Sequence, residues 1–103
     1  MNVSDLIATA GAYGVKVVFS DLGIYSGHEL RSEFDPSEPA IRINARLIGA
    51  MTPEQRGRFI AHAIGHELFH YFEHRGEIPT SRNRKAREEF ANGFAQTLIA
   101  WRA

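Results

Sequence analysis

Two histidines and a glutamate stand together in the stretch HELFH, residues 66–70. His66 and His70 are four residues apart, so on a helix both imidazoles lie on one face and can reach one tetrahedral metal ion. Glu67 follows the first histidine, where a carboxylate can act as general base towards water on that metal. The sequence contains no cysteine, so any metal ligands must be histidines or carboxylates.

The same stretch can be read in three registers, because histidines recur at every fourth position: His62, His66, His70 and His74. HAIGH (62–66) has the ligand spacing but carries Ala63 where the base is needed. HYFEH (70–74) matches an inverted motif, with Glu73 before the second histidine. HELFH supplies both ligands and the base. The alternative to all three is a solvated helix face that binds no metal.

A zinc centre with two histidines needs a third protein ligand, and the last helix offers two adjacent carboxylates. On a helical wheel, Glu88 begins a side of small residues that includes Ala95, which lets a neighbouring helix approach closely. Glu89 points about 100° away, towards a polar flank, and is expected to be solvated. We therefore predict Glu88 as the third ligand; the alternative is a surface carboxylate paired with Arg84. Asn92, one turn on, can hold a ligating histidine through its other ring nitrogen.

These side chains must be positioned by a small α+β fold. Thr52, Pro53 and Gln55 form a capping signal that opens the histidine helix. The opposite face of that helix is apolar and should dock on a sheet of about three strands. In the last helix, an apolar side is expected to contain Phe90, Phe94, Leu98 and Trp101. The predicted elements are a helix at about 5–13 capped by Ser4, strands at 15–19 (buried), 29–34 and 40–44, a helix at about 53–74, a loop at 76–83 and a helix from about 84 to the C-terminus.

The size and charge of the chain narrow the class of protein. A chain of 103 residues predicts one domain spanning 1–103. Twelve basic residues balance twelve acidic ones, which argues against direct binding to nucleic acid or to an acidic membrane. We find no signal peptide and no apolar run of membrane-spanning length, so a cytoplasmic protein is expected.

With these residues in place, the chain resembles the ImmA/IrrE family of zinc metallopeptidases. The resemblance rests on HELFH (66–70), on EEFANGFA (88–95) with its E-x-x-A-N-x-F-A pattern, and on AIRIN (40–44) ahead of the histidine helix. It covers roughly residues 15–100. One departure is Phe69, where glycine is common in the family.

The resemblance implies a minimal zincin-like domain in which His66, His70 and Glu88 hold Zn²⁺ and Glu67 is the catalytic base. It also implies hydrolysis of a protein substrate, with a repressor-like regulator as the expected class. Tyr25, Tyr71 and His74 are candidate donors to the oxyanion, although Tyr71 falls towards the apolar side of its helix. The alternative function is a catalytically silent metal-binding module that acts as an interaction partner or antirepressor.

Overall fold

A computed structural model of the protein describes residues 1–25 and 28–101, and for residues 24, 25, 28 and 29 it describes the backbone alone. The helices are α1 (Val3–Ala12), α2 (Ala45–Ile48), α3 (Pro53–His74) and α4 (Arg84–Ala100). The strands are β1 (Lys16–Ser20), β2 (Ile24–Tyr25), β3 (His28–Glu29), β4 (Ser32–Asp35) and β5 (Ala40–Asn44). The predicted α+β class is confirmed.

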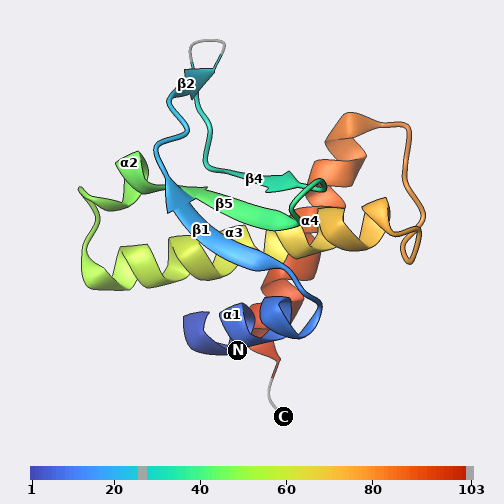
Figure 1. The fold of residues 1–103 in the computed structure, drawn as a ribbon, viewed down its shortest axis with the longest axis horizontal. Coiled ribbons are helices and arrows are strands. Elements are labelled where there is room, and N and C mark those ends of the chain that lie inside the picture. Colours follow the sequence, from blue (N-terminus) through green and yellow to red (C-terminus); the bar gives the residue numbers. More distant parts are fainter. Residues whose placement is uncertain (26–27, 102–103) are drawn as a thin grey trace.

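The main sheet has three strands in the order β1-β5-β4. β5 is central, parallel to β1 and antiparallel to β4, and a tight turn over residues 36–39 joins β4 to β5. β2 and β3 form a separate antiparallel pair. Figure 1 shows α3 lying along the sheet while α1 and α4 pack against α3. Among the described residues, no helix is long and apolar enough to cross a membrane.

The core lies between α3 and the sheet. Ile64 and Leu68 of α3 are fully buried against Ile41 and Ile43 of β5, and Leu6 of α1 closes the cluster. Burying each such side chain contributes about 1.5–3 kcal/mol. The predicted apolar face of the histidine helix is therefore the face that docks on the sheet, which leaves the histidine face directed away from it.

The boundaries of α3 agree with the capping signals. The Thr52 side chain accepts from the Gln55 backbone, the Gln55 side chain accepts from the Thr52 backbone, and Pro53 occupies the start of the helix. Gly76, with φ 77°, follows the end of the helix in a conformation that glycine adopts without strain.

α3 and α4 cross at very short range. A Cβ atom added to Gly65 would lie 2.8 Å from Cα of Ala95 and 2.9 Å from its Cβ. Only glycine on α3 and a small residue on α4 permit this crossing. The small-residue side of the last helix therefore does face its neighbour, as predicted.

The strand predicted at 29–34 is interrupted. The backbone leaves β3 at Glu29 and enters β4 only at Ser32. The cause is Asn44, which is fully buried: its Nδ2 donates to the carbonyl of Leu30 at 2.7 Å, and its backbone N–H donates to the carbonyl of Arg31 at 2.9 Å. Between Glu29 and Ser32, hydrogen bonds from Asn44 thus replace the regular backbone pairing of a β-sheet.

Other expectations were wrong in detail. The cap of α1 is Asn2, in a capping box with Asp5, rather than Ser4. β1 is an edge strand that is only half-buried: α1 packs against it, while Phe19 is 45% exposed. Phe90 of α4 and Trp101, which follows the end of α4, are exposed at 60% and 58%, whereas Phe94 and Leu98 pack on the core. The short α2 and the β2–β3 pair were not predicted.

Candidate metal centre

Three predicted ligands from two helices meet at one point. Nε2 of His66 lies 2.8 Å from Oε2 of Glu88, and Nε2 of His70 lies 3.4 Å from Oε1 of the same carboxylate. The two Nε2 atoms are 3.2 Å apart. Ligand atoms of His66, Glu67 and His70 all lie within 4.8 Å of one another. The two histidines and the glutamate of HELFH therefore form one compact cluster with Glu88.

The opposite ring nitrogens are each held by an oxygen. Nδ1 of His66 donates to Oδ1 of Asn92 at 2.8 Å, and Nδ1 of His70 donates to Oε1 of Glu73 at 2.7 Å. A neutral imidazole carries only one proton. In the neutral tautomer that donates from Nδ1, each Nε2 presents a lone pair to the centre.

The donor set fits a metal ion. In that tautomer, two Nε2 lone pairs and the carboxylate of Glu88 converge on one centre. Acceptors placed this close repel one another unless a cation or an additional proton lies between them. Two imidazole nitrogens, one carboxylate and the absence of thiolates match the ligands of a catalytic zinc site.

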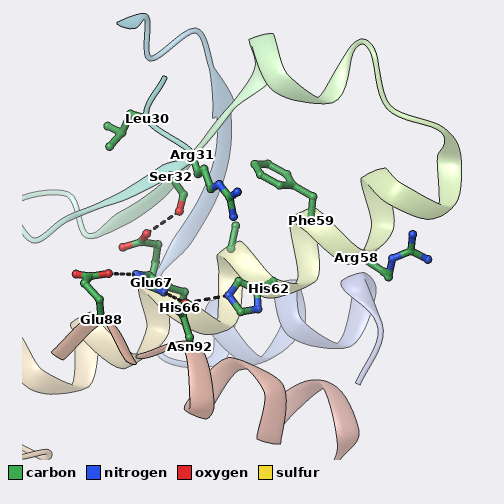
Figure 2. A pocket seen from close by; sticks show the side chains of 11 residues that line it. Leu30, Arg31, Ser32, Arg58, Phe59, His62, His66, Glu67, Glu88 and Asn92 are labelled. Carbon is green, nitrogen blue, oxygen red and sulfur yellow. Dashed lines mark hydrogen bonds and ion pairs between the residues drawn. The ribbon is translucent and has the colours of Figure 1, made fainter. Parts of the chain in front are cut away.

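Glu67 lies beside the cluster and is nearly enclosed, with 5% of its surface exposed. Burial raises the pKa of Glu67, whereas a hydrogen bond from the Ser32 hydroxyl and the nearby rings of His66 and His70 act in the opposite direction. The hydroxyl, on the first residue of β4, donates to Oε2 of Glu67 at 2.6 Å. This carboxylate is thereby held in one orientation next to the histidines (Figure 2).

Glu73 is the second buried carboxylate, with 3% of its side chain exposed. Nε and Nη2 of Arg87 donate to its two oxygens, each at 3.2 Å. Burial would raise the pKa of Glu73, but the hydrogen bonds from Arg87 and His70 outweigh it and the pKa lies below its usual value. Glu73 is therefore an anion that both orients His70 and connects α3 to α4.

The remaining candidates lie outside the cluster. His62 binds Oδ1 of Asn92 through Nε2 at 3.0 Å, so it supports the same amide that holds His66. His74 is exposed, with its ring 6.1 Å from that of Phe34. Glu89 is exposed, as expected. Tyr71 is buried in the core and its hydroxyl donates to the carbonyl of Tyr13, whereas the side chain of Tyr25 lies outside the described residues.

The alternative pairing of Glu88 with Arg84 is not formed among the described residues, because Glu88 contacts the histidines instead. The basic stretch 82–87 is otherwise an exposed helix start, apart from Arg87. Its contact with Glu73 could not be read from spacing, because the two residues are 14 positions apart on different helices. The inverted HxxEH pattern was the one signal that pointed to Glu73.

Two cavities open on either side of the cluster, and both are bordered by Ser32, His66, Glu67 and Glu88. The first has a volume of about 500 Å³ and extends towards the start of α3, past Leu30 and Phe59. The second, of about 590 Å³, extends towards Phe34, His74 and Arg84. The two cavities flank the cluster, so an extended chain could pass across it along the free edge of β4.

Comparison with known proteins gives one match. The description of a peptidase family, the IrrE N-terminal-like domain, fits residues 10–99. No curated protein and no solved structure matches the chain. The matched range contains β4, α3 and nearly all of α4, and so every residue of the cluster and its supporting hydrogen bonds.

Proposed function

Since the chain belongs to the peptidase family of the IrrE N-terminal-like domain, we propose that it is a zinc-dependent endopeptidase. The observation that carries the proposal is the convergence of His66, His70 and Glu88 beside the buried Glu67. A metal site that only stabilised the fold would not need Glu67, a further carboxylate that can act as general base, beside its three ligands. The family match covers the range that contains these residues, and the geometry brings their side chains together.

In the proposed reaction, His66, His70 and Glu88 would hold the zinc. When bound, zinc supplies a positive charge that polarises the scissile carbonyl and makes water more acidic. Glu67 accepts the proton of the attacking water and returns it to the nitrogen of the leaving amine. The hydroxyl of Ser32 keeps Glu67 oriented and favours its ionised form, which is the form that accepts a proton. Asn92 and Glu73 keep both imidazoles in the ligating tautomer.

We further propose a repressor-like regulatory protein as the substrate, in the cytoplasm, on the basis of the family resemblance. The equal numbers of acidic and basic residues support a protein substrate rather than direct binding to nucleic acid or membrane.

The metal content of the purified protein tests the ligand set. About one zinc per chain is expected in the wild type, with loss in Glu88→Gln and retention in Glu89→Gln. The second variant makes the same change at an exposed neighbour. Equal zinc in both variants would exclude Glu88 as a ligand, and no zinc in the wild type after zinc is supplied would remove the proposal.

Cleavage is tested on a library of peptides and on repressor domains, with Glu67→Gln beside the wild type. Removing a general base lowers the rate by about 10²–10⁴-fold, while zinc is expected to remain bound. Full zinc occupancy without cleavage of any substrate would favour the silent metal-binding module instead.

A further inference from the structure

We propose that the cavity between the metal centre and the start of α3 is a specificity subsite for an acidic side chain of the substrate, with Arg31 as the residue that recognises it. The inference rests on the proposed peptidase function, and it adds the class of residue that the site prefers beside the scissile bond. It is carried by the position of Arg31, the charges around it and the walls of the cavity.

Arg31 stands on a backbone that is held in place. Asn44 bonds the carbonyls of both Leu30 and Arg31, and the next residue, Ser32, bonds Glu67. Figure 2 shows the side chain of Arg31 directed into the space between Ser32 and Phe59, whereas Arg58 extends away from the cluster. Arg31 is therefore the cation that the fold directs into this cavity.

The charge of Arg31 is not balanced within the described part of the chain, where its guanidinium makes no ion pair or side-chain hydrogen bond. The two carboxylates that line the cavity are already engaged: Glu67 with Ser32, and Glu88 with the histidines. His62 is bound to Asn92. A carboxylate that entered the cavity would be the natural partner of Arg31.

The walls strengthen such a contact. Leu30, Phe59 and Ala63 line the cavity and are apolar, so the local dielectric beside them is lower than in open water. Arg31 itself is exposed and reaches these walls from the rim of the cavity. The volume of about 500 Å³ lies within the usual range for binding pockets. In the opposite cavity, Arg87 is already paired with Glu73, and Arg84 is an exposed cation in the first turn of α4. We place the acidic side chain on the Arg31 side because hydrogen bonds from Asn44 hold the backbone of Arg31 beside the apolar walls.

Small hydroxamates test this without a known substrate, because the hydroxamate chelates zinc and leaves its tail to explore the cavities. The probes are the monohydroxamates of succinic, glutaric and adipic acid, each beside the analogue with a terminal amide. Calorimetry on the zinc-loaded protein measures each affinity at low and high salt. The variants are Arg31→Gln, Arg31→Lys and Arg84→Gln, the last removing the same charge at the opposite cavity.

In the wild type, at least one acid should bind about tenfold more tightly than its amide, as one charge-assisted contact allows. The preference should decrease at high salt, disappear in Arg31→Gln, return in part in Arg31→Lys and persist in Arg84→Gln. Equal binding of every acid and amide, or a preference lost only in Arg84→Gln, would overturn the inference and leave the peptidase proposal intact. If no probe binds the zinc-loaded protein, the metal centre itself fails, and the inference with it.

Discussion

Each imidazole of HELFH is fixed by an oxygen on the side away from the centre. Asn92 holds His66 from α4, and Glu73 holds His70 from within α3. These two contacts determine which nitrogen of each ring carries the proton, and so whether the rings can act as ligands at all. For metal binding, the oxygens of Asn92 and Glu73 that orient the rings therefore matter as much as the ligands themselves.

Replacing Glu73 should weaken zinc binding without removing a ligand. Glu73→Gln keeps the shape of the side chain but loses the charge that orients His70 and pairs with Arg87. We expect a loss of about 10–100-fold in zinc affinity, measured by competition with a chelator. Glu77→Gln is the control, because Glu77 is exposed and lies 3.5 Å from its partner Arg75. Equal affinities in the two variants would contradict a positioning role for Glu73.

Replacing Ser32 should change the pH dependence of cleavage. The hydroxyl lowers the pKa of Glu67 against the raising effect of burial, so Ser32→Ala should raise that pKa further. The base acts in its ionised form, so the acid limb of the kcat/KM profile should move to higher pH. Ser4→Ala, at an exposed position of α1, should leave the limb in place. An unmoved limb in Ser32→Ala would show that the hydroxyl does not control this proton.

At the scale of the elements, the site depends on how closely α4 approaches α3. The proposed ligand Glu88 and the supporting Asn92 and Arg87 all come from α4, while the histidines come from α3. The contact of Gly65 with Ala95 sets the separation of the two helices at their crossing. The geometry of the cluster thus depends on the close packing of Gly65 against Ala95.

A methyl group at this crossing should damage both the fold and the site. Gly65→Ala would force α4 away, and overpacking of this kind costs about 1–3 kcal/mol of unfolding free energy. Gly57→Ala lies on the same helix, where an added Cβ meets nothing within 4 Å, and should stabilise by up to about 1 kcal/mol. Denaturant unfolding and zinc affinity measured on both variants separate the two effects. A Gly65→Ala protein as stable as the wild type would show that the crossing can relax.

Much of this arrangement could be predicted from local sequence patterns. The capping residues and the four-residue histidine spacing predicted α3, and the small-residue side of the last helix distinguished Glu88 from Glu89. The contacts of Ser32 with Glu67 and of Arg87 with Glu73 could not be predicted, because they join positions 35 and 14 residues apart. The interruption of the strand before β4 could not be predicted for the same reason, because it is caused by the distant Asn44.

For the whole molecule, the metal should act as a link between segments. The proposed ligands come from two helices that are brought together only when the chain folds. The unfolded chain therefore offers no preformed site. Zinc at a hundredfold excess over its dissociation constant should add about 2.7 kcal/mol to the unfolding free energy. Thermal unfolding with zinc, and again after chelation, measures this difference. It should vanish in Glu88→Gln if that variant no longer binds zinc, and a wild-type melting temperature that chelation does not change would contradict the linkage.

The division of the ligands between α3 and α4 also has a consequence during synthesis. The ribosome makes His66, Glu67 and His70 before it makes Glu88, and at about 5–20 residues per second the interval from His70 to Glu88 lasts about one to four seconds. Until α4 has emerged and docked on Gly65, the nascent chain carries two histidines and a base but no third ligand and no Asn92. In the proposed peptidase, metal retention therefore waits for the docking of α4, and we expect the unfinished chain not to cleave the proteins that surround its own ribosome.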